Sequence, residues 1–272
     1  MVGMDLLSIL LLGLVQGVTE WVPVSSKTQD TLVYLSVLHG NPSLVVPILL
    51  YLHLGTFFAA ILYFRTDLRD MLKEFREKPL DVRAHLQGRP GFLFTALFFT
   101  GIVGIPILLL EKRYLASMDA GILFAVMGIG LVVTGIFLLT HRKPRLRGVG
   151  EATWRDGVLT GLLQGLSTLP GISRSGTSTS GLIWRGFDSE ASFHLSFLLS
   201  IPTVLLAEMV FYIGGSLFAL PPSDGLLLAL VSFVFGYLTI DAVLRIVKRV
   251  NLAYVALGMG IIIIIVGLVG AG

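Results

Sequence analysis

The chain contains no cysteine and few charged residues. Without cysteine it can form no disulfide, no thiolate metal site and no cysteine nucleophile. Charged residues make up 14% of its 272 positions, and 54% of the positions are hydrophobic. An average soluble domain carries about 25% charged residues. A water-soluble surface cannot be built from this composition, which therefore predicts an integral membrane protein.

Six apolar runs are long enough to cross a bilayer, which takes about 20 helical residues. They cover residues 44–64, 91–110, 120–140, 193–214, 225–244 and 252–270. The segment 4–19 is also largely apolar, but no basic region precedes it and Glu20 follows it instead of small residues, so we do not expect a signal peptide. The sequence predicts an all-α polytopic membrane protein with six transmembrane helices.

An internal repeat divides the chain into two halves. The segment Gly13-Leu-Val-Gln-Gly-Val-Thr recurs as Gly161-Leu-Leu-Gln-Gly-Leu-Ser. Each copy is followed by a proline, a serine-rich turn, a short weakly polar helix (about 28–38 and 175–187) and three apolar spans. Three is an odd number, so the second half enters the membrane in the opposite orientation. We expect one membrane domain built as an inverted-topology repeat of 1–145 and 146–272.

The segments around the two copies form hairpins that are too short to cross the membrane twice. Each arm holds too few apolar residues, and a turn with proline and serine separates the arms. Irregular backbone survives at membrane depth only where protein or a water-filled cavity surrounds it. We therefore expect two re-entrant helical hairpins whose tips meet in the protein interior.

The basic residues indicate the orientation, because short loops rich in Lys and Arg stay in the cytoplasm. Outside the hairpins, nearly all of them fall in the segments 65–90, 141–155 and 245–251, whereas only Lys112 and Arg113 fall on the other side. This predicts a multi-pass protein of the cell membrane whose first hairpin enters from outside. Basic residues spread over short loops do not form one basic face, so nucleic acid is not an expected partner.

The first hairpin tip carries a carboxylate. Gln16 and Glu20 are four residues apart and share one helix face. Ionisable groups in membrane segments are costly and usually functional, although Glu20 could instead pair with Lys27 or cap the turn. Ser25 and Ser26 precede a new helix, where serine commonly caps free amides. We count Glu20 as the only carboxylate of this tip.

The second tip carries an arginine among hydroxyl groups. Arg174 offers a planar fork matched to phosphate oxygens. Around it, Ser173, Ser175, Gly176 and Thr177 begin a helix whose positive end favours an anion. The alternative is that these hydroxyls only pack between helices. Two such tips aimed at one point predict a strongly anionic ligand.

At these residues the sequence resembles the undecaprenyl-diphosphatase family of bacitracin-resistance proteins, over nearly the whole chain. One signature is Glu/Gln-x-x-x-Glu followed by Pro-Val-Ser-Ser, here Gln16 to Ser26. The other is Pro-Gly-x-Ser-Arg-Ser-x-x-Thr, which begins here at Pro170 and has Ser178 in the last position. The resemblance implies metal-dependent release of phosphate from a polyprenyl diphosphate, a membrane lipid that serves as a carrier in cell-wall synthesis, at a site open to the outside.

The resemblance also implies roles for individual residues. Glu20 would bind the metal, with Mg²⁺ or Ca²⁺ expected, or act as a base, and Gln16 would be its helix partner. Ser26 would be the nucleophile or a substrate ligand, and Arg174 would hold the diphosphate. As further substrate-binding candidates we place Ser25, Lys27, Gln29, Ser173, Ser175, Gly176, Thr177 and His53.

Two departures from the family pattern leave the mechanism open. Many members have a glutamate at the place of Gln16 and a histidine at that of Gln29, so a serine nucleophile here depends on Glu20, a metal ion or His53. A lone histidine inside a span is, however, more often packed than catalytic. The second hypothesis is a transporter or flippase of polyprenyl phosphate without hydrolysis, because inverted repeats with broken helices are typical of transporters. The sequence leaves the oligomeric state open, with a homodimer as one alternative.

Overall fold

The computed structural model describes residues 4–77, 81–114, 118–140, 146–213, 220–247 and 249–270. Within these ranges the structure is helical, apart from one isolated bridge between Arg147 and Phe187. Six helices are long and apolar enough to cross a membrane: α3 (Val45–Tyr63), α6 (Arg89–Tyr114), α7 (Ala120–Leu139), α10 (Ser189–Ile213), α11 (Pro222–Ile246) and α12 (Leu252–Gly270). Each overlaps one of the predicted runs, so the prediction of six apolar spans is confirmed.

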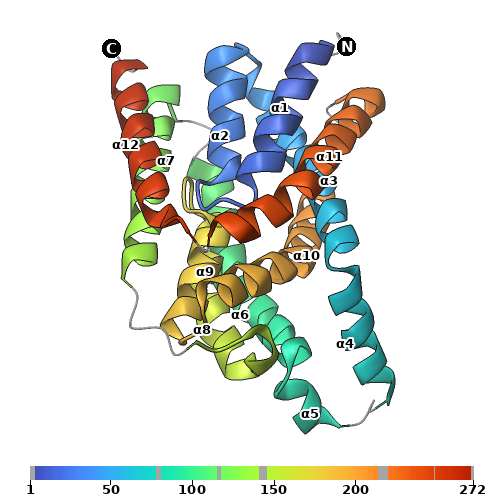
Figure 1. Cartoon of the computed structure of the whole chain (residues 1–272). Coiled ribbons are helices and arrows are strands. Elements are labelled where there is room, and N and C mark those ends of the chain that lie inside the picture. Colours follow the sequence, from blue (N-terminus) through green and yellow to red (C-terminus); the bar gives the residue numbers. More distant parts are fainter. Residues whose placement is uncertain are drawn as a thin grey trace.

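Two pairs of shorter helices account for the predicted hairpins. The first pair is α1 (Leu6–Thr19) and α2 (Ser26–Leu32), which continues as the π-helix η1 (Val33–Val37), and the second is α8 (Trp154–Gly165) and α9 (Arg174–Trp184). In Figure 1 the helices α1 and α2 lie at the end of the molecule that carries both termini, and α8 and α9 lie toward the opposite end. In both pairs the second helix begins slightly earlier than the sequence predicted.

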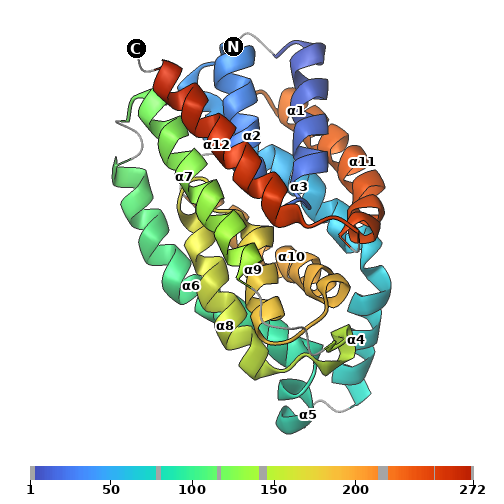
Figure 2. The ribbon, with the colours of Figure 1, turned by 60° about the vertical axis from the view of Figure 1, so that its left-hand side comes forward.

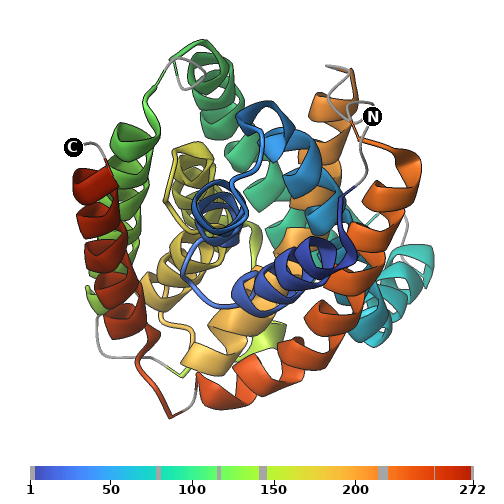
Figure 3. The same cartoon turned by 90° about the horizontal axis from the view of Figure 1, so that it is seen from above.

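The amphipathic helix α4 (Arg65–Glu77) and the short α5 (Val82–Leu86) lie at the end opposite to the termini, as Figure 1 shows. Both belong to the basic segment 65–90. Viewed from above in Figure 3, α2 occupies the middle of the molecule and the longer helices surround it. Polar residues on α2 are thereby removed from the lipid-facing surface.

Glycines of the repeated motif allow close helix packing. Helix α1 packs against α11, and α8 packs against α6. A Cβ atom on Gly17 would lie 2.7 Å from the Gly236 amide nitrogen, and one on Gly161 would lie 2.3 Å from the Ala96 carbonyl oxygen. Small residues at membrane helix interfaces let the backbones approach in this way. Figure 2 shows α12 lying along α7, where Gly128 packs in the same manner against the Gly260 carbonyl oxygen.

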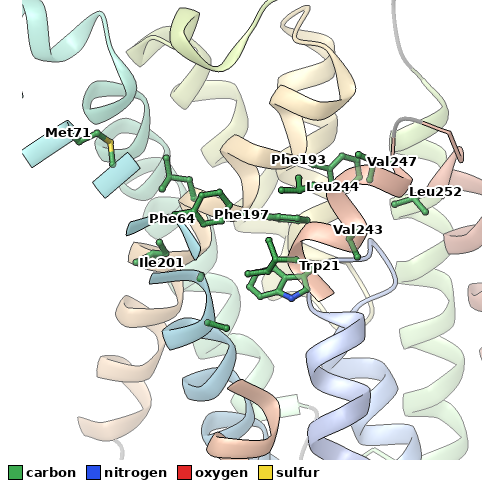
Figure 4. Close-up of a cluster of buried hydrophobic side chains, with 14 residues drawn as sticks. Trp21, Phe64, Met71, Phe193, Phe197, Ile201, Val243, Leu244, Val247 and Leu252 are labelled. Carbon is green, nitrogen blue, oxygen red and sulfur yellow. The ribbon is translucent and has the colours of Figure 1, made fainter. Parts of the chain in front are cut away.

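A buried aromatic cluster anchors the tip of the first hairpin (Figure 4). Trp21, directly after Glu20, is 1% exposed and packs with its ring centroid 5.2 Å from that of Phe197 on α10. Its indole Nε1 donates to the Gly236 carbonyl oxygen on α11 at 3.0 Å. An aromatic ring fixed on one side by packing and on the other by a hydrogen bond holds the neighbouring Glu20 in one place.

Candidate active site

Glu20 stands at the end of α1, where its amide still donates to the Gln16 carbonyl oxygen. Its carboxylate is buried and accepts two hydrogen bonds at Oε2, one from Ser26 Oγ at 2.7 Å and one from Gln16 Nε2 at 3.0 Å. Ser26 is the first residue of α2, so the turn 21–25 brings the start of one helix back to the end of the other. The hydroxyl and the carboxylate form a donor–acceptor pair within the first tip.

Arg174 joins the second tip to the first. Its Nη2 donates to Glu20 Oε1, and its Nη1 donates to the Ser196 carbonyl oxygen on α10 at 3.4 Å. The hydroxyl of Ser175 also donates to the Val22 carbonyl oxygen at 3.3 Å. An ion pair therefore joins the two tips, between residues that the chain separates by 154 positions.

His53 reaches the same carboxylate from α3. Its Nε2 lies 3.6 Å from Glu20 Oε2, and its Nδ1 lies 2.7 Å from the Leu49 carbonyl oxygen. Because that carbonyl can only accept, Nδ1 carries a proton, and a second proton on Nε2 would pair the ring with Glu20. A lone histidine inside a span is more often packed than functional, but His53 was also a candidate for substrate binding, and the structure places it beside Glu20.

Exposure of the side chains increases from Glu20 outward. The relative exposure of the side chain is 4% for Glu20, 15% for Arg174 and 24% for His53. A phosphate group arriving from solvent would therefore meet the arginine and the histidine before the carboxylate.

The other predicted residues of the first tip shape its turn. Ser25 has a positive φ of 58°, and its Oγ accepts from Thr28 Oγ1 at 3.0 Å. It makes no side-chain cap hydrogen bond to α2, so the capping alternative is wrong for Ser25. The side-chain Nε2 of Gln29 donates to the Val24 carbonyl oxygen at 2.9 Å and so fastens the turn to α2. Lys27, in the first turn of α2, is partly exposed.

In the second tip, Ser173 is the cap of α9. Its Oγ accepts from the Gly176 amide at 3.3 Å, lies 3.2 Å from Ser175 Oγ, and its own amide donates to Thr134 Oγ1 at 3.0 Å. Helix α9 therefore begins one residue before the predicted start, and α7 supports this start through Thr134. Serine at this position satisfies an amide that would otherwise have no partner.

Two predicted substrate-binding residues of α9 face protein instead of the first tip's carboxylate. Thr177 is fully buried, and its hydroxyl donates back to the carbonyl oxygens of Ser173 and Arg174. A Cβ atom on Gly176 would lie 2.3 Å from Thr134 Cγ2, so the glycine lets α9 lie close to α7. Thr177 and Gly176 therefore pack between helices, as the alternative interpretation had it. Of the α9 residues, Arg174 is the one whose charged group contacts the first tip.

Residues 9–269 match the family model described as bacitracin resistance protein BacA. The chain belongs to this family. The matched range includes both hairpin tips and all six long helices, so the family resemblance drawn from the motifs is confirmed.

Several relatives of this chain bear the name undecaprenyl-diphosphatase. The relative from Methanococcoides burtonii is 39% identical over 264 residues, which cover 93% of this chain and 95% of the relative. The relative from Haloarcula marismortui is 38% identical over 244 residues, covering 89% of each chain. That from Methanothrix thermoacetophila is 34% identical over 260 residues, covering 95% of this chain and 96% of the relative.

Asp30 is a buried carboxylate that the sequence reasoning missed. It lies on α2, one helical turn after Ser26, and is 1% exposed. Its charge and that of Glu20 repel each other. Glu20 is the only carboxylate between Asp5 and Asp30, but Asp30 itself is buried one helical turn beyond Ser26. The four-residue spacing from Ser26 was visible in the sequence, but nothing there showed that this face of α2 is buried.

The oxygen atoms around the first tip partly fit a hard divalent cation. Among the described residues, no group of three or more His, Cys, Asp or Glu side chains could hold a metal ion. Glu20 already accepts from three side chains, but Gln16 Oε1 and both carboxylate oxygens of Asp30 are buried without a hydrogen-bond partner. Mg²⁺ is commonly held by one or two carboxylates together with water and substrate phosphates, so such a partial set suffices.

Proposed function

We propose that this chain is a membrane phosphatase that hydrolyses undecaprenyl diphosphate to the monophosphate and inorganic phosphate, and so recycles the lipid carrier. The relatives named undecaprenyl-diphosphatase support the reaction and the substrate. The observation that carries the proposal is the meeting of Ser26, Glu20 and Arg174, because it combines a hydroxyl, its proton acceptor and a phosphate-binding cation at one point.

Ser26 and Glu20 have the geometry of a nucleophile and its base. In the first step Ser26 Oγ attacks the terminal phosphorus, its proton passes to Glu20, and the bond from that phosphorus to the bridging oxygen breaks, which releases the lipid monophosphate. Water then attacks the phosphoserine. Ser26 Oγ leaves and recovers the proton from Glu20, and inorganic phosphate is released. Each step uses the 2.7 Å hydrogen bond between the two side chains.

Arg174 binds the diphosphate in this scheme. A guanidinium makes two parallel hydrogen bonds to phosphate oxygens, and its charge stabilises the charge that develops as the phosphoryl group is transferred. The ion pair with Glu20 aims the guanidinium at the base, so a bound phosphate is held beside Ser26. The start of α9 adds the positive end of a helix.

A divalent cation, Mg²⁺ or Ca²⁺, would neutralise charge on the diphosphate and polarise its phosphorus–oxygen bonds. The buried oxygen atoms of Glu20, Gln16 and Asp30 would hold it.

For the architecture, we propose that α1–α2 and α8–α9 are re-entrant hairpins of an inverted repeat, with 1–145 and 146–272 as its halves. The helix contacts support this, because the first arm of each hairpin packs on a long helix of the other half: α1 packs on α11, and α8 packs on α6. The basic segment 65–90, at the end opposite to the termini, faces the cytoplasm. The first hairpin and its site then open to the outside of the cell membrane.

The reaction is tested with the purified protein in lipid nanodiscs, undecaprenyl diphosphate, and added Mg²⁺ or Ca²⁺. We expect phosphate release, and we expect Glu20→Gln to lower its rate by at least about a hundredfold, as for loss of a general base. Glu77→Gln, on the exposed face of α4, is the control and should keep the rate of the unchanged protein. Transfer of polyprenyl phosphate between leaflets without hydrolysis would instead support the flippase hypothesis.

The orientation is tested with single cysteines in this cysteine-free chain. Cysteines at Leu72 and Leu146 should react only with reagents on the cytoplasmic side, and cysteines at Met118 and Ser223 only with reagents outside. Labelling of all four positions from one side would refute the inverted repeat and leave the catalytic proposal untouched.

A further inference from the structure

Asp30 is a buried carboxyl group that has no hydrogen-bond partner in the described structure. It is 1% exposed, and neither of its carboxylate oxygens has a hydrogen-bond partner among the described residues. It lies on α2, which the longer helices surround (Figure 3). A buried carboxylate without partners is costly, and such groups in proteins are usually paired or bound to a metal. Repulsion from Glu20 adds to the cost.

Gln16 contributes another acceptor without a partner. Its Nε2 donates to Glu20 Oε2 at 3.0 Å and to Thr56 Oγ1 at 3.3 Å, and its Oε1 is buried with no donor. The amide cannot be reversed, because its oxygen would then face the carboxylate of Glu20. Both hydrogen bonds of the Gln16 side chain use its Nε2, so its Oε1 remains available to bind another group.

The antiparallel hairpin sets Gln16 and Asp30 at a common level. Near the tip, Ser26 on α2 bonds to Glu20 at the end of α1. One helical turn farther from the tip, the same faces carry Asp30 on α2 and Gln16 on α1. Three buried acceptor oxygens thus belong to one turn of the hairpin, and the groups that could satisfy them are donors or a cation.

The second hairpin provides an internal contrast. Gln164, the counterpart of Gln16, also has a buried Oε1 without a partner. The facing helix α9, however, contains no aspartate or glutamate. Only in the first hairpin does the unsatisfied amide oxygen stand opposite a carboxyl group, so only this hairpin offers oxygen ligands from both of its arms.

We infer that Asp30 and Gln16 Oε1 form a binding site for one hard divalent cation, one helical turn above Glu20 in the first hairpin. Oxygen ligands of this kind select Mg²⁺, Ca²⁺ or Mn²⁺ over softer metals. The cation neutralises Asp30 and lies beside the proposed phosphate position, so its role in catalysis rests on the proposed function. Its binding does not, because both protein ligands are present without substrate and water can fill the remaining positions.

The test is Mn²⁺ binding, followed by electron paramagnetic resonance, to the purified full-length protein without lipid diphosphate. We expect one site per chain, and Asp30→Asn should weaken binding at least tenfold. That is the lower end of the loss seen even for outer-shell residues of metal sites. Asp5→Asn, at the exposed start of α1, is the matched control and should leave the affinity unchanged.

A double variant tests the placement of the ligands. Asp30→Asn combined with Gln16→Glu moves the carboxylate to the facing arm at the same level, so it should recover most of the Mn²⁺ affinity. Asp30→Asn also removes a buried carboxyl group that has no partner, and without metal its thermal unfolding midpoint should equal or exceed that of the unchanged protein.

Three results would overturn the inference: no Mn²⁺ binding by the unchanged protein, unaltered affinity in Asp30→Asn, or failure of the double variant to recover while it remains folded. Hydrolysis measured in parallel separates the two proposals. A protein that binds Mn²⁺ but releases no phosphate would refute the proposed function alone, and one that hydrolyses the lipid without a Mn²⁺ site would refute this inference alone.

Discussion

The first arms of the two hairpins, α1 and α8, share a glycine–glutamine motif but use the glutamine differently. Gln16 donates to Glu20 and to a threonine of α3, whereas Gln164 donates to Thr100 at 3.1 Å and to Thr203 at 3.0 Å. The Gln16 amide donates to a charged carboxylate, whereas the Gln164 amide donates to two uncharged hydroxyl groups on neighbouring helices. The same backbone scaffold therefore holds a site in one half and a packing contact in the other.

The tips differ in charge in a complementary way. The first tip presents the carboxylate of Glu20 and the hydroxyl of Ser26, and the second presents the guanidinium of Arg174. Each tip supplies a part of the site that the other does not: the first supplies the base and the hydroxyl, and the second supplies the guanidinium. The comparison teaches that the site is composite and depends on both hairpins reaching one point.

The bases of the hairpins differ as well. Asp156, in the first turn of α8, is fully buried and bonds to Arg147 and Arg185 and to the Thr153 amide. Asp5, the cap of α1, is exposed and bonds mainly to Ser8. The second hairpin is thus fastened at its base by an ion cluster, whereas Trp21 fastens the first hairpin at its tip.

Arg174→Lys should produce the largest effect and would break the contrast between the tips. An ammonium keeps the charge but cannot make the two parallel bonds of a guanidinium. We expect phosphate release to fall by roughly a hundredfold to a thousandfold, as when one preorganised donor to a transition state is lost. Arg185→Lys, at the other end of α9, is the control and should retain most of the activity. Near-normal turnover in Arg174→Lys would show that Arg174 is structural.

Asp156→Asn should produce the next largest effect, on stability. Burial alone would raise the pKa of the Asp156 carboxyl, but hydrogen bonds from Arg147, Arg185 and Thr153 together hold that pKa below its ordinary value. Loss of the charge leaves two arginines without their partner. We expect a destabilisation of roughly 3 kcal/mol, the low end for a broken buried pair, because both arginines are partly exposed. Thermal unfolding measures it.

The same carboxyl gives a pH dependence with a defined sign. Because its pKa is lower in the folded state, its contribution to stability is complete above the unfolded pKa of about 3.9 and is lost as pH falls through the lower folded value. The difference in unfolding midpoint between the unchanged protein and Asp156→Asn should therefore be constant near neutral pH and shrink in acid below about pH 4. A difference that grew on acidification would contradict the assignment.

Replacing each of the two glutamines with leucine should have the smallest effect. It would compare the two hairpins most directly. Gln16→Leu removes a donor to the charged Glu20, so phosphate release should fall about tenfold, since hydrogen bonds to charged groups contribute about 1.5–3 kcal/mol. Gln164→Leu removes bonds between neutral helices, and it should lower the unfolding midpoint while activity stays within about threefold. Equal losses of activity in both variants would mean that the two hairpins are functionally equivalent.

Much of the molecule follows from the sequence alone. The six spans and the two pairs of short helices depend on the local length of apolar runs, and the start of α9 depends on local capping by Ser173, so the order of residues along the chain is enough to predict them. The choice of Glu20 and Arg174 followed from the cost of placing charges in membrane segments. These statements need no knowledge of which helices touch.

Which side chains share the site was decided only by tertiary structure. His53 reaches Glu20 because α3 is rotated toward the hairpin, Asp30 is buried because the long helices surround α2, and Gly176 faces α7 because α9 packs there. Each depends on the rotation and contact of helices far apart in the chain. Most membrane spans here are apolar on every face, so hydrophobic periodicity cannot fix those rotations, and the packing of small residues between helices does so instead.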